Sequence, residues 1–144
     1  MAATSRFAIA THLCTSLALE AEKGHGSATS EYLASSVNTH PVVIRRLLGQ
    51  LAKAELVSTC PGKNGGFGLA RPANKITLWD IYLAIGAEPI FAPNPHAVNP
   101  NCPVSRHMRQ ALDPVMLGAE EALKHELSRR KLSMLAAELK DLAA

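Results

Sequence analysis

Residues 39–57 read THPVVIRRLLGQLAKAELV and carry the clearest helical pattern of the chain. Pro41 suits the first position of a helix, where a backbone N–H would have no intrahelical partner anyway. The apolar residues behind it recur three and four positions apart, which predicts a helix with one buried face. They are Val43, Ile44, Leu47, Leu48, Leu51 and Ala54. Arg45 and Arg46 stand beside that face, so we expect both side chains to point outward.

Two further helices are predicted upstream of this one. Apolar residues at helical spacing run from Ser5 until Gly24 and Gly26 end the pattern. Thr29 and Ser30 then offer caps for a short helix that reaches about Ser36. Two helices joined by a tight turn, the second with a basic outer face, form a helix-turn-helix, which presents its second helix to a DNA major groove.

A hairpin is predicted directly downstream of the helix-turn-helix. Residues 56–60 and 67–70 have the composition of two strands, and the intervening tip reads PGKNGG. A basic hairpin in this position makes the domain a winged helix. Gly65 and Gly66 could let the backbone of the tip approach a DNA groove or a phosphate closely. They could also simply allow the backbone to turn, and the two functions are compatible.

The C-terminal part combines a loop with helices. Thr77 and Asp80 have the spacing of a capping box for a helix reaching Ile85. Five prolines make residues 87–103 an extended loop, and residues 104–131 follow as an amphipathic helix of roughly 40 Å. Such a helix is longer than a small domain needs, so we expect it to bury its apolar stripe against a second copy. That stripe comprises Val104, Met108, Ala111, Val115, Ala119, Ala122 and Leu127.

Pro114 and Ser133 allow more than one arrangement of the C-terminal helices. Pro114 should kink the long helix or split it, with Asp113 capping the second piece. Ser133 is expected to cap a closing helix that packs either on the dimer or on the first helix. The predicted fold is therefore mainly α, divided into a winged-helix domain (1–86), a Pro-rich loop (87–103) and a dimerisation region (104–144).

Basic charge is concentrated in the predicted helix-turn-helix and wing. Residues 41–75 contain six basic residues and one acidic residue, a net charge of +5, whereas the rest of the chain has nine basic and eleven acidic, a net −2. A basic segment in an otherwise slightly acidic chain is typical of a partner that carries phosphates. We therefore expect double-stranded DNA as a partner.

Four motifs together resemble one protein family. They are THPVVIRR at 39–46, LAKAELV at 51–57, GKNGGFGLAR at 62–71 and ITLWDI at 76–81. These resemble the bacterial Rrf family of winged-helix transcription regulators, the family of IscR, NsrR and CymR. The resemblance implies a homodimeric regulator, usually a repressor, whose two winged helices read the half-sites of an inverted-repeat operator.

The resemblance departs from many family members at the loop. Those members carry three loop cysteines that hold an iron–sulphur cluster, but this loop has only Cys102. One thiolate per protomer cannot supply the usual ligands, so the chain resembles a cluster-free branch and no cofactor is expected. Members with an arginine before the wing glycine insert it into the minor groove. This chain has Pro61 there, so Lys63 either substitutes for the arginine or the contact is absent.

The candidate DNA-binding residues come from the helix-turn-helix and the wing. They are Thr39, His40, Val42, Arg45, Arg46, Lys53, Lys63, Asn64, Gly65, Gly66 and Arg71. The arginines of the second helix can read guanine edges or bind phosphates, and Val42 can touch a thymine methyl group. Thr39 either contacts DNA or caps the helix. Lys53 and Arg71 are phosphate contacts or simply solvated charges.

Three cysteines at wide spacings suggest reduced thiols rather than disulfides or a zinc module. Cys14 and Cys60 are expected to be small core residues. Cys102 precedes the long helix, whose N-terminus stabilises a thiolate, so it is the candidate redox sensor, with an inert residue as the alternative. The one conceivable metal set, His96, Cys102 and His107, matches no zinc signature, so no metal site is predicted.

Several function classes are excluded or disfavoured by what the sequence lacks. It contains no catalytic or phosphate-loop motif, so we do not expect an enzyme. It contains neither a membrane span nor a signal peptide, so a cytoplasmic location is expected. Two alternatives to the DNA-binding regulator stay open: a winged helix used for protein interactions, and a metal or iron–sulphur sensor of the same family.

Overall fold

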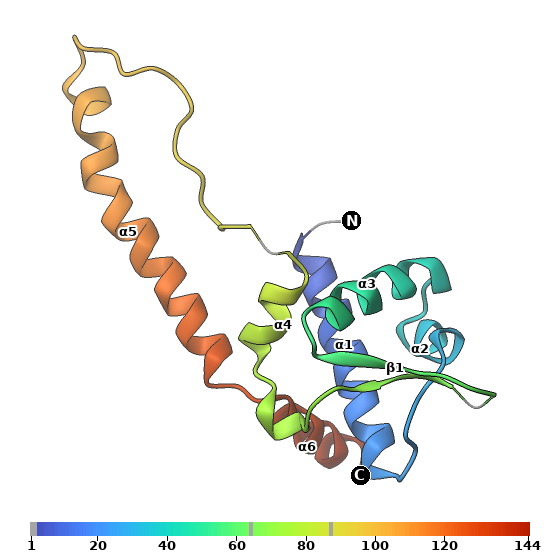
Figure 1. Cartoon of the computed structure of the whole chain (residues 1–144). Coiled ribbons are helices and arrows are strands. Elements are labelled where there is room, and N and C mark those ends of the chain that lie inside the picture. The colour runs from blue at the N-terminus through green and yellow to red at the C-terminus, as the bar shows by residue number, and fades with distance from the viewer. Residues whose placement is uncertain (1–2, 64, 87) are drawn as a thin grey trace. The chain divides into compact units, whose positions relative to one another are not determined.

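The computed structural model describes residues 3–63, 65–86 and 88–144 and is mainly helical (Figure 1). Its elements follow in the order α1 (Ala3–Glu22), α2 (Ser30–Val37), α3 (Pro41–Lys53), β1 (Val57–Cys60), β2 (Gly66–Leu69), η1 (Ala73–Lys75), α4 (Leu78–Ala84), α5 (Pro103–Ser128) and α6 (Leu132–Ala143). The two strands form one antiparallel sheet. The predicted winged helix with a long C-terminal helix is confirmed.

The chain forms two compact units. The first comprises Met1–Ala87 together with Leu127–Ala144, and the second comprises Glu88–Glu126. The segment 104–144 is thus divided between them, because α6 packs on the winged helix. Among the described residues, no helix has both the length and the apolar character that a bilayer crossing requires.

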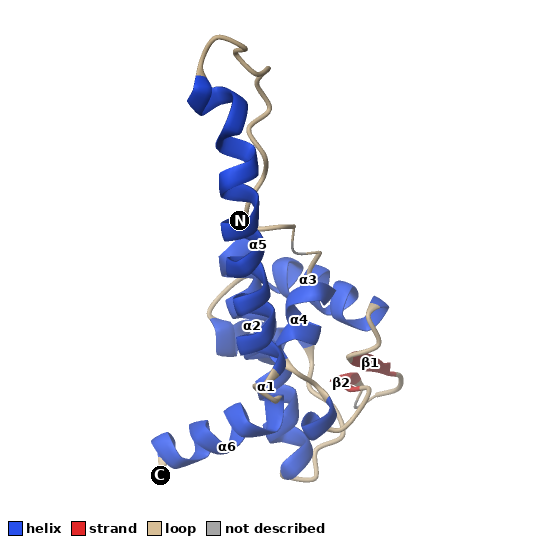
Figure 2. Ribbon diagram, turned by 90° about the vertical axis from the view of Figure 1, so that its left-hand side faces the viewer, coloured by secondary structure: helices blue, strands red, loops and turns tan. Residues whose placement is uncertain are grey.

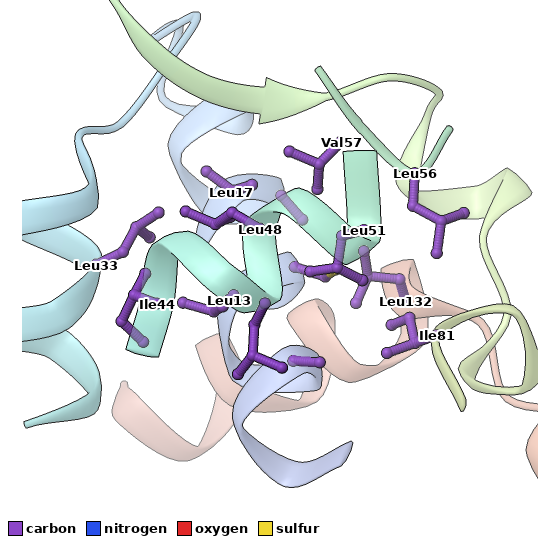
Figure 3. Packing of buried hydrophobic residues seen from close by; sticks show 14 of the residues in the cluster. Leu13, Leu17, Leu33, Ile44, Leu48, Leu51, Leu56, Val57, Ile81 and Leu132 are labelled. Atoms are coloured by element: carbon purple, nitrogen blue, oxygen red, sulfur yellow. The ribbon is translucent and has the colours of Figure 1, made fainter. Parts of the chain in front are cut away.

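The core of the first unit lies between α1 and the helix-turn-helix (Figure 3). Helix α1 packs against α2, α3, α4, α6 and β2. The buried face of α3 is the predicted one, with Ile44, Leu47, Leu48 and Leu51 almost fully enclosed. Full burial of each such side chain contributes about 1.5–3 kcal/mol. This anchoring gives α3 a fixed outer face.

The wing is held to the body by a third short segment. Within the sheet, Val57 pairs with Leu69 and Cys60 with Gly66. Ala28 lies on the other side of β2, where its N–H donates to the carbonyl of Phe67 (2.9 Å) and its carbonyl accepts from the N–H of Phe67 (2.8 Å). The wing is therefore part of the folded domain rather than a free hairpin.

The wing glycines are explained by close packing of backbone. A Cβ on Gly66 would overlap the carbonyl of Ala28, and one on Gly65 would overlap the carbonyl of Cys60. Neither glycine has a positive φ, whereas Gly62 does, at +108°. Gly62 takes the positive φ of the tip turn, and the N–H of Gly65 closes that turn by donating to the carbonyl of Gly62 (3.0 Å). Gly66 is small because the backbone of Ala28 lies against it.

Helix α6 closes the first unit, and the predicted cap at Ser133 is wrong. The backbone N–H of Leu132 donates to the carbonyl of Ile76 (2.8 Å), and that of Leu78 donates to the carbonyl of Arg130 (2.9 Å). These bonds set the start of the helix, so Lys131 is its N-cap residue. Of the two packing alternatives, contact with α1 is observed.

Helix α5 is one continuous helix (Figure 2). Pro114 lies within its bounds. The predicted split is therefore wrong, while a kink stays a prediction, because an interior proline removes one backbone hydrogen bond and crowds the carbonyl four residues earlier. The expected second cap at Asp113 is therefore wrong, and its carboxylate instead lies 3.5 Å from the Nε of Arg109. The 26 residues of α5 span about 39 Å, and none of them is buried within this chain.

Candidate nucleic-acid interface

The helix-turn-helix is built by local hydrogen bonds around its turn. The hydroxyl of Thr29 accepts from the N–H of Tyr32 (3.1 Å) and caps α2, as predicted. Asn38 ends α2 in the left-handed conformation, with φ at 65°. Asparagine tolerates this region better than most residues. The next N–H, that of Thr39, donates to the carbonyl of Ala34 (3.0 Å) and completes the turn.

The start of α3 is capped by His40. The N–H of Val42 donates to its Nδ1 (3.2 Å), so the capping alternative for Thr39 is wrong. The reason is positional, because Pro41 occupies the first helical position and the cap is the residue immediately before it. A neutral His40 then carries its proton on Nε2, which is available as a donor to a phosphate or base edge.

The outer face of α3 presents the predicted side chains to solvent. Val42, Arg45, Arg46, Gly49 and Lys53 are all exposed. Successive residues turn by about 100° around a helix, so Arg45 and Arg46 lie on opposite flanks of this face. A helix anchored in this way can present one arginine to each side of a groove.

The wing adds basic groups beside α3. Lys63 is exposed at the tip, and Arg71 is exposed at the far end of β2. The Nε–H of Arg71 donates to the carbonyl of Glu55 (3.4 Å), which ties the end of the wing to the turn after α3. Asn64, also predicted to bind DNA, lies outside the described residues.

A polar cluster around Glu20 joins the end of α1 to α2. Its carboxylate accepts from Nδ1 of His25 (2.6 Å) and from the hydroxyl of Tyr32 (3.2 Å), and it pairs with Lys23 (3.4 Å). The bond from His25 is the main cause that lowers the pKa of Glu20 below 4.5. Lys23 stands three residues after Glu20, a helical spacing, but His25 and Tyr32 follow no helical or strand period, so the sequence pattern did not reveal the cluster.

The cysteines occupy different environments. Cys14 is fully buried, and burial raises its pKa to about 12, which agrees with the predicted inert core thiol. Cys60 is half-buried rather than part of the core, and its thiol faces the carbonyl of Gly26 (3.8 Å). Cys102 is half-buried immediately before α5, and its carbonyl accepts from the N–H of Arg106 (3.0 Å).

Among the described residues, the side chains that could bind a metal are not gathered at one site. Across the described residues, no three or more histidine, cysteine, aspartate or glutamate side chains gather closely enough to hold a metal ion. An iron–sulphur cluster commonly takes four protein ligands. The described chain offers no such set.

Comparison with known proteins places this winged helix in a family. The model of the Rrf2 family, described as iron-dependent transcriptional regulators, matches residues 3–138. The chain belongs to the Rrf2 family. The predicted resemblance is thereby confirmed, and this Rrf2 protein is a transcription regulator with a DNA-binding winged helix rather than an enzyme.

Individual relatives agree with this assignment. YwnA of Bacillus subtilis strain 168, whose name describes an HTH-type transcriptional regulator, is 33% identical over 89% of this chain and 92% of its own length. The oxidised form of Staphylococcus aureus CymR has a TM-score of 0.70 at 24% identity, covering 94% of this chain and 96% of CymR. T. potens IscR has a TM-score of 0.73 at 16% identity, and the match covers 96% of this chain and 88% of IscR. At these identities, the two solved structures show the shared fold.

Proposed function

We propose that this Rrf2 protein acts in the cytoplasm as a homodimeric repressor that reads an inverted-repeat operator. The observation that carries the proposal is the rigid outer face of α3, with Arg45 and Arg46 exposed on opposite flanks. Lys53, Lys63 and Arg71 extend the basic surface along the helix and wing. Guanidinium groups suit guanine edges, and the additional cations suit phosphates.

Selection of binding sites from a random duplex library tests this proposal directly. The purified, reduced protein should enrich an inverted repeat whose half-sites lie about one helical turn apart, roughly 34–36 Å. Binding to the selected site should weaken steeply with salt. Enrichment of no sequence above the starting library would contradict the proposal and favour a winged helix used for protein contacts.

The exposed stripe of α5 supports the proposed dimer. Val104, Met108 and Val115 are 62%, 48% and 65% exposed, and their spacing puts them on one helix face. The smaller stripe residues Ala111, Ala119 and Ala122 are exposed on the same face. Contact with a second copy would bury this face, and knobs-into-holes packing suits its three- and four-residue spacing. Leu127, the last residue of the predicted stripe, lies on another side of α5, because successive residues turn by about 100° around a helix.

Val115→Glu is expected to convert the dimer to a monomer and to weaken operator binding, because the charge would be buried in the interface without a partner. Light scattering coupled to size-exclusion chromatography measures the mass. Leu117→Glu is the matched control, since Leu117 is 60% exposed and lies on the opposite face of α5. A dimeric Val115→Glu protein would refute the predicted stripe.

We further propose that the protein works without an iron–sulphur cluster and senses oxidants through Cys102. Its half-buried position at the start of α5 supports this function. Hydrogen peroxide would oxidise the thiolate to a sulfenic acid and be reduced to water. The solved oxidised form of CymR gives a structural precedent for an oxidised relative.

Cys102→Ser should abolish peroxide-induced release from DNA while leaving binding of the reduced protein unchanged. A fluorescence-anisotropy titration with and without peroxide measures this release. Cys60→Ser is the control, because Cys60 is also half-buried but lies on the wing. A Cys102→Ser protein that still responds to peroxide as the parent does would remove Cys102 from the mechanism.

A further inference from the structure

We propose that a recess between the start of α1 and α3 binds a phosphate of the DNA backbone, with Arg6 and Arg46 as its cationic residues. The inference rests on the proposed function and extends the interface to α1, which the sequence did not indicate. Arg6 lies outside the basic segment and was not among the predicted DNA-binding residues.

The residues that line the recess suit an anion. Its volume is about 480 Å³. The described residues that line it include two arginines and no carboxylate: Arg6, Thr39, Val43, Arg46, Leu47 and Gln50. The arginines supply positive charge, while the hydroxyl of Thr39 and the amide of Gln50 supply neutral donors. Guanidinium groups form strong charge-assisted hydrogen bonds with phosphate oxygens.

Arg6 is held in place before any ligand arrives. Its Nη1–H donates to the carbonyl of Ile85 (3.2 Å), and the residue is half-buried. That bond uses one of the five N–H groups of the guanidinium. A side chain already ordered in this way loses less conformational entropy on binding than a free surface arginine.

The position of the recess favours a backbone phosphate over a base edge. It lies on one flank of α3, the flank that carries Arg46 and Gln50, rather than on the outermost line through Val42. A helix about 10–12 Å wide nearly fills a major groove of about 12 Å, so its flanks face the two phosphate backbones. A backbone phosphate is therefore the group that should meet this recess.

Gln50→Glu tests the recess without removing either arginine. The added carboxylate should repel a bound phosphate and weaken binding to all duplexes alike, by about tenfold, with the salt dependence shallower by about one phosphate contact. The base preference and the thermal midpoint should stay unchanged. Gln110→Glu, the same substitution on an exposed position of α5, should bind as the parent does.

Arg6→Gln provides a second measurement, because glutamine retains donors but removes the charge. Arg6→Gln should make the salt dependence of DNA binding shallower by about one phosphate contact, as Gln50→Glu does. If this variant unfolds through loss of the bond to Ile85, Gln50→Glu alone decides. A Gln50→Glu protein with parental affinity and salt dependence would overturn the inference. If Arg45→Ala still weakened specific binding in the same assay, the proposed function would stand.

Inorganic phosphate distinguishes a DNA site from a small-anion site. If millimolar phosphate raised the thermal midpoint of the parent but not of Gln50→Glu, while both bound DNA equally, the recess would hold a free anion and the inference would be wrong. If the parent selected no sequence at all, the proposed function itself would fail.

Discussion

Replacing Arg45 and Arg46 together by alanine should leave a folded dimer whose operator affinity is reduced by about 50-fold or more. Both side chains are exposed on α3, and the core-facing residues beside them stay in place. Alanine also favours the helix. A good bidentate base contact by Arg45 contributes about 1–3 kcal/mol, and the loss of a phosphate contact by Arg46 is expected to cost about another tenfold, so operator binding should weaken by about 50-fold or more.

Anisotropy titrations with the selected operator and with random duplex measure this loss. The control is Arg106→Ala combined with Arg109→Ala, which removes the same charge from exposed positions of α5. That variant should still bind the operator more tightly than random DNA, by the same factor as the parent. Unchanged operator affinity of the Arg45 and Arg46 variant would refute the role assigned to α3.

Gly66→Ala should destabilise the protein by about 3–5 kcal/mol. The new Cβ would overlap the carbonyl of Ala28, which is backbone and cannot move aside by rotating a side chain. Separating the segments would lose the two hydrogen bonds between Ala28 and Phe67 as well as their packing. Overpacking costs about 1–3 kcal/mol, and each lost hydrogen bond about 1 kcal/mol.

Urea unfolding followed by circular dichroism measures the change in the free energy of unfolding. Gly49→Ala is the matched control in the same unit, because a Cβ there meets nothing within 4 Å. In the middle of an exposed helix face, alanine should stabilise by up to about 1 kcal/mol. Equal midpoints for Gly66→Ala and the parent would show that the wing can separate from Ala28 without loss of stability.

Most of the helical framework could be predicted because its signals are local. The cap at Thr29, the proline at the start of α3 and the capping box of Thr77 with Asp80 each act within one helical turn. The buried face of α3 follows from spacing alone, because a helix has one fixed period. The exposure of Arg45 and Arg46 follows from that same period.

Some of the errors arose where distant backbone decides a local feature. Ser133 is a reasonable cap by composition, yet the bonds of Leu132 and Leu78 start α6 at a different residue. Cys60 looks like a core residue on a strand, yet its neighbours leave it half-exposed. In the wing, Gly66 has the composition of a turn, yet a Cβ there would overlap the carbonyl of Ala28, which comes from a distant segment.

The sequence by itself determined the family, the order of the elements and the residues that α3 turns toward solvent, because periodicity, caps and charge placement act over short ranges. Only the tertiary structure placed Ala28 against Phe67, Glu20 beside Tyr32, and Arg6 at the carbonyl of Ile85 in a recess that Arg46 also lines. These contacts join segments separated by long stretches of chain. Their partners are selected by how the helices pack together, which no local pattern records.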